Sequence, residues 1–538
     1  MLGSMTGAYV APGALETGAL QDDTQPVLFS FTLLAGLIAF AVGLNTRLVL
    51  SDADSYWHIA VGRWMLEHRT VPVRDVFSHS VPGIPFTAHE WLSELLMARV
   101  HDTVGWQGLQ VMAALSFAFV IMYMLRFLFA RMEPLHAIAL ATVCASMIVT
   151  HLLARPHVIV WPITVVWTGT LVQAVERRTR PPWWLLAMLL LWTNLHASFT
   201  LGLVFAGALA LEAFWEAGER DARWHVVRQW APFLALAALC VLCNPRGVYA
   251  ITHALSVMRL KATLALVAEW RSADFHHMQP FLVWTIAVLL LAFTGRLRLT
   301  LFRAFFVLGL FYLALKHQRY HSLVGLVSPY LLAGPLAAVA RAHAGTGGSD
   351  VDALDRLFRK LASRAGAVGV GIALLLAVGL AWFSARVNPA RPNVIVTPER
   401  ALAAFNATGA LGNVFNTYSY GGYLIYRGVP VFFDGRGDMY GDALMTEASN
   451  ASELRTDRAL QKLLAKYRIG WTLLHPESPA VQLLDFLPEW KRVYGDSVAV
   501  VHVRRDLLPA VSPASLPASQ DTAQPTHPTK SLVLPATR

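Results

Sequence analysis

Charged residues are scarce in this sequence. Asp, Glu, Lys and Arg together make up 14% of the 538 residues, whereas a soluble domain carries about a quarter. Hydrophobic residues account for 55% of the chain. The scarcity of charge excludes an ordinary soluble protein, and the composition predicts a membrane protein.

Cysteine and early basic residues are also in short supply. The three cysteines, Cys144, Cys240 and Cys243, all lie in apolar stretches, so they say nothing about the redox compartment. The CxxC spacing of Cys240 and Cys243 is more often packing than redox or metal chemistry in a membrane helix. The first 26 residues contain no Lys or Arg, so we expect no cleavable signal peptide.

The basic residues are distributed in a way that favours a membrane over nucleic acid. The formal net charge is +10, but most Lys and Arg residues lie in short loops between apolar runs. Anionic lipid headgroups are the partner that this pattern predicts. The 17 Trp residues suit a protein with two membrane interfaces. The bilayer is therefore the expected partner, and nucleic acid is not.

Long apolar runs recur along most of the chain. A helix needs about 20 apolar residues to cross the hydrocarbon core. About eleven runs approach that length, at 27–48, 109–130, 136–154, 158–174, 183–193, 199–215, 230–243, 281–294, 299–315, 323–340 and 365–385. The sequence thus predicts an all-α polytopic membrane domain over 27–385.

The positions of Lys and Arg predict the orientation of these spans. Basic clusters are densest in alternate loops when the segment 1–26 is placed in the cytoplasm. This topology puts four segments outside: the first loop 51–108, the turn 155–157, the loop 244–279 and the turn 316–321. We therefore expect a multi-pass protein of the inner (plasma) membrane.

After the last apolar run the composition becomes that of a soluble fold. We predict a small extracytoplasmic α/β domain over 393–506, with a disordered tail rich in Pro, Ala, Ser and Thr over 507–538. The expected strands are 414–415, 423–426, 429–433, 471–474 and 498–503, and the expected short helices are 459–466 and 481–486.

Two acids follow the first apolar run almost directly. The segment Ser51-Asp-Ala-Asp-Ser-Tyr-Trp-His58 puts Asp52 and Asp54 at the membrane surface, where unpaired carboxylates are expensive. Asp52 could simply cap an amphipathic helix over 56–66. Capping does not exclude chemistry, so both acids and His58 are candidates for proton transfer.

The first loop continues to a second polar group. In Ala88-His-Glu-Trp-Leu-Ser-Glu94, His89 and Glu90 open another amphipathic helix. They could be ordinary interfacial residues. Together with the acids and His58, they form a set suited to proton transfer or to a divalent metal.

These features resemble the GT-C superfamily of integral-membrane glycosyltransferases. The resemblance rests on an Asp shortly after the first span, a long first loop, about eleven spans and an outside domain, with an Asp-x-Asp-x-x-Trp-His opening and an Ala-His-Glu-Trp segment. The plan is similar to oligosaccharyltransferase catalytic subunits and protein mannosyltransferases. It implies transfer, with inversion, from a polyprenyl-phosphate-linked sugar to a glycan, lipid or protein acceptor outside the cytoplasm.

The resemblance also implies roles for individual residues. Asp52 would be the general base or a ligand of Mg²⁺ or Mn²⁺, with Asp54 as the competing candidate. Many members of the superfamily carry an acidic pair in the second outside loop, but here the turn is Arg155-Pro-His157. This departure disfavours a metal and favours neutralisation of the phosphate by cationic side chains.

Other polar residues fall on the same predicted side. Each could be an interfacial residue that extends to the headgroups, but together they form a rim suited to phosphate. The predicted phosphate-binding residues are Arg155, His157, Asn194, His196, Arg246, Lys316, Arg319 and His321. In the outside domain, Asp434 and Arg436 are candidates for sugar contact, although packing also explains them.

Two other classes of function compete with the transferase. An O-antigen ligase or polymerase also uses lipid-linked glycans, but its long loop typically comes late in the chain. A transporter or scaffold that binds envelope polymers would need acids along a path, and Glu212 is one of few candidates. The long first loop favours the glycosyltransferase.

Overall fold

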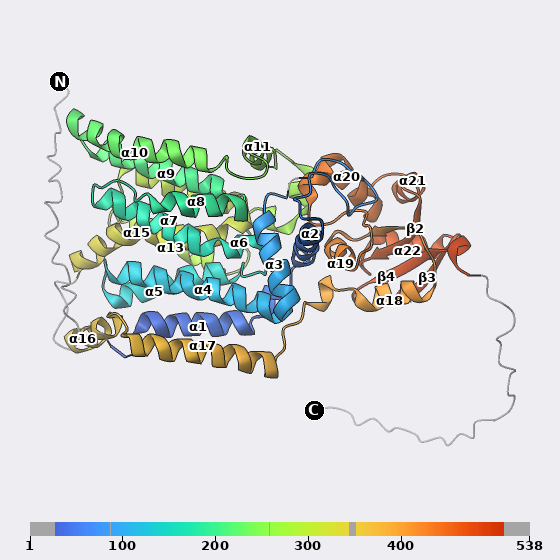
Figure 1. The fold of residues 1–538 in the computed structure, drawn as a ribbon, viewed down its shortest axis with the longest axis horizontal. Coiled ribbons are helices and arrows are strands. Elements are labelled where there is room, and N and C mark those ends of the chain that lie inside the picture. The colour runs from blue at the N-terminus through green and yellow to red at the C-terminus, as the bar shows by residue number, and fades with distance from the viewer. Residues whose placement is uncertain (1–26, 29, 87, 258, 344–350, 510–538) are drawn as a thin grey trace, which may run out of the picture.

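The computed structural model describes residues 27–509 apart from 29, 87, 258 and 344–350. It consists of a bundle of long helices and, at one end of the bundle, a smaller unit built around a sheet (Figure 1). We call residues 393–509 the C-terminal unit. The predicted segment 1–26 and residues 510–538 of the predicted tail lie outside the described residues.

The bundle helices coincide with the apolar runs of the sequence. They are α1 (Phe31–Asn45), α4 (Trp106–Phe129), α5 (Pro134–Val149), α7 (Trp161–Glu176), α8 (Trp184–Leu195), α9 (Phe199–Glu216), α10 (Arg220–Cys240), α13 (Pro280–Phe293), α14 (Leu301–Lys316), α15 (His321–His343) and α17 (Ala367–Val387). Each predicted run overlaps one of them. Between α15 and α17 lies a further helix, α16 (Val351–Ala362).

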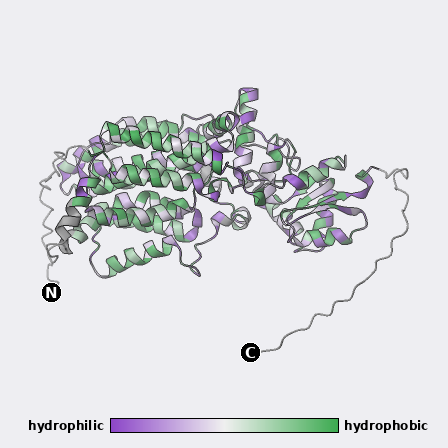
Figure 2. Ribbon diagram, turned by 90° about the horizontal axis from the view of Figure 1, so that it is seen from below, coloured by the Kyte–Doolittle hydropathy of each residue, from purple (hydrophilic) through white to green (hydrophobic). Residues whose placement is uncertain are grey.

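Apolar side chains cover much of the outside of the bundle. Leu375 on α17 is 74% exposed and Phe293 at the end of α13 is 85% exposed, which suits a surface in contact with lipid. Hydrophobic residues dominate the bundle (Figure 2). Among the described residues, four helical stretches are long and apolar enough to cross a membrane: Trp106–Phe129, Phe199–Glu216, Gln318–Ala340 and Ala367–Val387. The chain is a multi-pass membrane protein.

The four segments predicted to lie outside meet at one end of the bundle. Two helices of the first loop, α2 (Asp54–His68) and α3 (Trp91–Val104), lie across this end (Figure 1). Short helices from the other segments join them, namely α6 (Pro156–Ile159), α11 (Val248–Val257) and α12 (Ala262–Leu266). The Gln318 backbone N–H donates to the Arg271 carbonyl at 2.9 Å, which ties two of the segments together.

The C-terminal unit contains a four-stranded sheet in the order β1-β2-β4-β3. The strands are β1 (Asn413–Asn416), β2 (Ile469–Leu474), β3 (Trp490–Gly495) and β4 (Val500–Arg504), and the helices are α18 (Glu399–Ala407), α19 (Gly421–Tyr426), α20 (Gly437–Ser452), α21 (Ala459–Lys466) and α22 (Pro479–Phe486). β1 and β2 are parallel, while β4 is antiparallel to both β2 and β3. Every residue of β2 is buried, as expected for a central strand.

Two of the predicted strands are wrong. Residues 423–426 form part of α19, and 429–433 make only an isolated bridge between Val431 and Ser78. A short apolar run does not distinguish a strand from a buried helix. The decisive contact is tertiary, because the rings of Tyr423 and Tyr426 pack against Tyr56 of α2 at 5.3 and 5.2 Å.

The C-terminal unit is packed tightly against the first loop. A Cβ atom on Gly422 would lie 2.3 Å from the carbonyl oxygen of Ala53, so only glycine allows this approach. The same holds at Gly435, where a Cβ would lie 1.8 Å from Oδ1 of Asp54. Asp54, at the start of α2, is therefore covered by the C-terminal unit.

Candidate active site

An arginine and three acids form the centre of the site. We call Asp52, Asp54, Arg155 and Glu269 the acid–arginine cluster. Nη1 of Arg155 lies 3.0 Å from Oδ2 of Asp52 and 2.7 Å from Oε1 of Glu269, and Nη2 lies 2.6 Å from Oδ2 of Asp54. These residues come from three of the segments that meet at the end of the bundle.

Local hydrogen bonds explain how the cluster is positioned. Oδ1 of Asp52 accepts from the Asp54 backbone N–H at 2.7 Å, so Asp52 orders the turn that leads into α2. The Ser55 hydroxyl donates to the Ala154 carbonyl at 2.8 Å, which places the start of α2 beside Arg155. The N-cap of α2 is Ala53, so the prediction that Asp52 caps this helix is wrong; Asp52 instead orders the turn before it and contacts the cluster.

The electrostatic environment shifts the pKa values of Asp54 and Glu269 in opposite directions. Burial raises the pKa of Asp54 to about 7, although Arg155 acts in the opposite direction. Arg155 lowers the pKa of Glu269 to about 2. A carboxyl group that titrates near neutral pH suits acid–base chemistry, whereas a strongly acidic one remains a fixed charge.

A second cluster lies between α2 and α3. Nε2 of His58 is 3.6 Å from Oε2 of Glu90, and its Nδ1 is 3.4 Å from Oε1 of Glu94. Glu90 also contacts His196 at 3.0 Å and His89 at 3.7 Å. Burial lowers the pKa of His58 well below its usual value and raises the pKa of Glu94 well above it. We call His58, Glu90 and Glu94 the His–Glu–Glu triad.

The triad fits a divalent cation better than the acid–arginine cluster does. The carboxylates of Asp52 and Asp54 already contact the guanidinium of Arg155, which supplies the positive charge there. In the triad, one ligand atom from each residue lies within 4.8 Å of the others. Oε2 of Glu94 is buried and has no hydrogen-bond partner among the described residues. An imidazole and two carboxylates form a suitable donor set for Zn²⁺ or Mn²⁺.

The polar network continues into the C-terminal unit. Nε2 of His253 on α11 lies 3.0 Å from Oδ2 of Asp438, and the His253 ring lies 5.4 Å from the ring of His89. Hydrogen bonding to His253 helps to lower the pKa of Asp438 against the effect of burial. Acids and imidazoles thus extend from α20 to α3.

A cleft of about 90 Å³ opens beside these clusters. Its polar lining consists mainly of His151, His157, His196, Glu269 and Arg319, and its apolar lining includes Val160, Trp161, Leu201, Phe205 and Leu326. Phe205 and Leu326 lie more than one turn from the starts of α9 and α15, so they line the deeper part. The cleft therefore combines a polar mouth with an apolar interior.

Burial favours the neutral form of His157 and His196 in the cleft. Burial lowers the pKa of His157 to about 3 and the pKa of His196 well below its usual value. They therefore act as hydrogen-bonding groups at neutral pH. Positive charge at the mouth comes from Arg319, whose guanidinium lies 4.4 Å from the Trp270 ring centre.

The other residues of the predicted phosphate rim lie elsewhere. Asn194 accepts from the Trp91 indole at 2.9 Å, Arg246 lies over the Tyr249 ring, and Lys316 is exposed beside Tyr312. His321 is buried and stacks on Phe281 at 4.4 Å. None of these four lines the cleft as the structure describes it.

Asp434 and Arg436 are buried at the contact with the first loop. Their side chains form a bidentate pair at 2.8 and 2.7 Å, and Nη1 of Arg436 reaches Asp75 at 2.7 Å. Asp434 is 0% exposed and Arg436 is 1% exposed. This placement supports packing rather than contact with a sugar.

Sequence reasoning missed four residues of these networks. Glu94 carried a signal, because residues at i and i+4 share one face of a helix with Glu90. Glu269, His253 and Asp438 lie in segments with no local pattern pointing to the site. These residues join the site by contacting residues more than a hundred positions away in the sequence, as Glu269 does with Arg155.

No protein-family model matches this sequence, and no curated protein matches it either. Solved structures do match in fold. The apo oligosaccharyltransferase of Archaeoglobus fulgidus is 12% identical, with a TM-score of 0.53, and the match covers 82% of this chain and 69% of that one. AglB of that organism, in complex with an inhibitory peptide and a dolichol-phosphate, gives 11% identity, a TM-score of 0.50 and coverage of 82% and 69%.

A third match is ArnT from Cupriavidus metallidurans bound to undecaprenyl phosphate. It is 13% identical, with a TM-score of 0.47, and the match covers 88% of this chain and 97% of that one. The likeness to the archaeal oligosaccharyltransferase confirms the resemblance to a GT-C-like fold, whereas the number of spans stays a prediction. This chain has the GT-C-like fold of integral-membrane glycosyltransferases.

Proposed function

We propose that this protein transfers a sugar, with inversion, from a polyprenyl-phosphate carrier to an acceptor on the extracytoplasmic side of the inner membrane. The observation that carries the proposal is the amphiphilic cleft beside the acid–arginine cluster. Its mouth holds Arg319, and its interior is lined by side chains such as Phe205 and Leu326. A lipid phosphate needs both environments.

In this proposal Asp54 is the general base. It takes the proton of an acceptor hydroxyl, the acceptor oxygen bonds to the anomeric carbon, and the bond from that carbon to the carrier phosphate breaks. The electron pair leaves with the phosphate, whose charge Arg319 stabilises. Arg155 holds Asp54 in position through its 2.6 Å contact, and Asp52 orders the turn. The neighbour AglB binds a dolichol-phosphate, which supports a carrier of this chemistry.

The proposal includes a topology. The apolar runs would give about eleven spans over 27–385, with the segment 1–26 in the cytoplasm and the domain 393–506 outside. It is supported by the four predicted outside segments, which meet at the end of the bundle that carries the C-terminal unit (Figure 1).

The direct test is mass spectrometry of lipid-linked intermediates and envelope glycans in cells with and without the protein. We expect a polyprenyl-linked sugar to accumulate when the protein is missing, together with loss of that sugar from a glycan. Unchanged lipid-linked pools and glycans would contradict the proposal. Uptake by purified protein in liposomes without glycosyl transfer would favour a transporter instead.

Activity should depend on pH in the direction set by Asp54. Because burial raises the pKa of this carboxyl to about 7, the ionised base becomes more abundant as pH rises. The transfer rate at saturating donor should therefore increase between about pH 6 and pH 8 and then level off. A rate that is flat or falls over this range would exclude the assigned base.

The raised pKa of Asp54 also makes the folded protein less stable as pH rises. Folded Asp54 keeps its proton between the ordinary value of 3.8 and about 7. Its contribution to the free energy of unfolding is therefore present at low pH and lost as pH rises through about 7. Thermal unfolding over the same pH range would separate this effect from the change in rate.

The His–Glu–Glu triad should hold any divalent metal that the protein binds. A metal there would neutralise the buried carboxylates and polarise a coordinated oxygen. We expect metal analysis after dialysis against Zn²⁺ or Mn²⁺ to find about one ion per chain, and Glu94→Gln to lose it. Glu67→Gln, at an exposed position on α2, is the control. Equal metal contents in both variants would show that the triad is not the site.

A further inference from the structure

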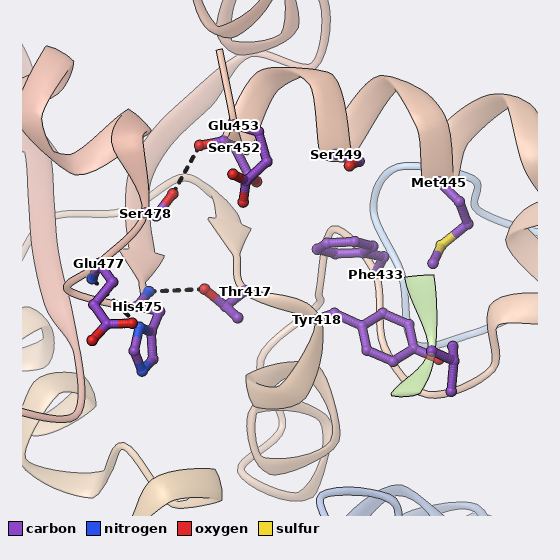
Figure 3. A pocket seen from close by; sticks show the side chains of 11 residues that line it. Thr417, Tyr418, Phe433, Met445, Ser449, Ser452, Glu453, His475, Glu477 and Ser478 are labelled. Carbon is purple, nitrogen blue, oxygen red and sulfur yellow. Dashed lines mark hydrogen bonds between the residues drawn. The ribbon is translucent and has the colours of Figure 1, made fainter. Parts of the chain in front are cut away.

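A second cavity, of about 460 Å³, lies in the C-terminal unit. Figure 3 shows the rings of Tyr418 and Phe433 on one side, His475 and Glu477 on the other, and along the top Ser449 of α20 and Glu453, which directly follows that helix. The transfer mechanism uses none of these side chains. The cavity therefore needs a separate explanation.

The fold places this cavity where α/β sheets bind ligands. Thr417 directly follows β1, and His475 directly follows β2. These two strands are parallel, so their carboxyl ends lie at the same edge of the sheet. The crevice outside the carboxyl ends of parallel strands is the usual ligand position in open α/β sheets. The Thr417 hydroxyl accepts from the His475 backbone N–H at 2.9 Å (Figure 3), which fixes the floor of the cavity.

The lining suits sugar hydroxyls and disfavours phosphate. Thr417, Ser449, Ser452 and Ser478 contribute polar groups, and Tyr418 and Phe433 contribute aromatic surface. The acidic residues among the described residues that line the cavity are Glu453 and Glu477, both of which are exposed. Carboxylates accept hydrogen bonds from hydroxyl groups but repel anions.

Segments that line or adjoin the cavity also reach the acid–arginine cluster. Its lining includes Val267, which precedes Glu269 by two positions in sequence. A Cβ on Gly437 would lie 3.3 Å from the Tyr418 hydroxyl, and a Cβ on Gly435 would lie 1.8 Å from Oδ1 of Asp54. The segment 435–437 therefore contacts both Tyr418, which lines the cavity, and Asp54, the proposed base.

We propose that this cavity binds an uncharged glycan, as the part of the acceptor that lies outside the membrane. The sugar rings would lie against Tyr418 and Phe433, with hydroxyl groups directed to Ser449 and Glu453. This inference rests on the proposed function, because it names the acceptor class of that reaction. The two acids disfavour a phosphorylated acceptor in the cavity.

Binding can be tested without any transfer assay. The full-length protein in detergent would be examined by saturation-transfer NMR with maltotriose, cellotriose and N,N′,N″-triacetylchitotriose, and with glucose 6-phosphate as the anionic probe. We expect at least one neutral trisaccharide to bind and the phosphate ester not to bind. Ser449→Phe, which fills the cavity, should weaken that binding at least about tenfold.

Two further variants complete the test: one controls for misfolding, and the other tests the role of the two acids. Thr446→Phe adds the same ring at an exposed position on α20 and should bind like the unmodified protein. The double variant Glu453→Gln/Glu477→Gln alters exposed residues only and should allow glucose 6-phosphate to bind. If no neutral trisaccharide binds, or if Ser449→Phe binds as tightly as Thr446→Phe, the proposed site is wrong.

The results also separate this inference from the transferase. Sugar binding that Ser449→Phe abolishes, in a protein that transfers nothing, would support the cavity and contradict the transferase. If transfer occurs but Ser449→Phe leaves the KM for the acceptor unchanged, the transferase stands and the glycan site does not.

Discussion

Replacing Asp54 with Asn is expected to lower the rate of glycan transfer by about 10²- to 10⁴-fold, the range associated with loss of a general base. Asn has nearly the same shape and can still contact Arg155, but it does not accept a proton at neutral pH. Transfer would be measured in membranes with a lipid-linked donor at saturating concentration. The KM for the donor should change little, because Asp54 does not line the cleft assigned to the carrier.

Asp52→Asn is the matched comparison. Its amide oxygen can still accept from the Asp54 backbone N–H, the bond that Asp52 makes at 2.7 Å, so we expect a loss of less than about tenfold. Glu67→Gln, on the exposed side of α2, should have no effect. Full activity in Asp54→Asn would show that Asp54 is not the base. A larger loss in Asp52→Asn would assign the role of base to Asp52.

Replacing Arg436 with Met should destabilise the protein by about 3–5 kcal/mol, the usual result of removing one partner from a buried ion pair. Asp434 and Asp75 are both buried and both paired with Arg436. Without the guanidinium, two carboxylates would remain in a site lined by Phe77 and Phe86. We expect a lower Tm in detergent and a C-terminal unit that separates from the first loop.

Arg492→Met provides the control for this prediction. Arg492 pairs with Asp485 in the same unit, but its side chain is 45% exposed, and exposed pairs contribute about 0–1 kcal/mol. Thermal unfolding and limited proteolysis would compare the two variants. Equal Tm values would show that the buried pair does not hold the unit in place.

The apolar runs predicted the helices well because the hydrophobicity of each segment by itself determines whether that segment lies in lipid. Residues 109–130 overlap α4, and 365–385 overlap α17. In the C-terminal unit the predicted helix 459–466 matches α21, whereas the strand predicted at 423–426 is helical. The helix α20 was not predicted, because Gly437 and Gly441 give a sequence typical of loops.

The site was predicted only where its residues share a short segment or a common face of the membrane. Asp52, Asp54 and Arg155 were named from the sequence, and the structure brings them together. His58 and Glu90 were also predicted to act together because both lie in the first loop, and their side chains are in contact. Glu269 could not be found this way, because its partner is a residue 114 positions distant.

The pairing of Asp75 with Arg436 has a consequence for the order in which the protein is made. The two residues are 361 positions apart, and at about 5–20 residues per second the ribosome needs roughly 20–70 s to travel between them. During that time the first loop has been made but lacks Arg436, the partner of its buried Asp75, and the unit that covers it. Completion of the chain is therefore also the step that closes the site, so a truncated product would lack that cover.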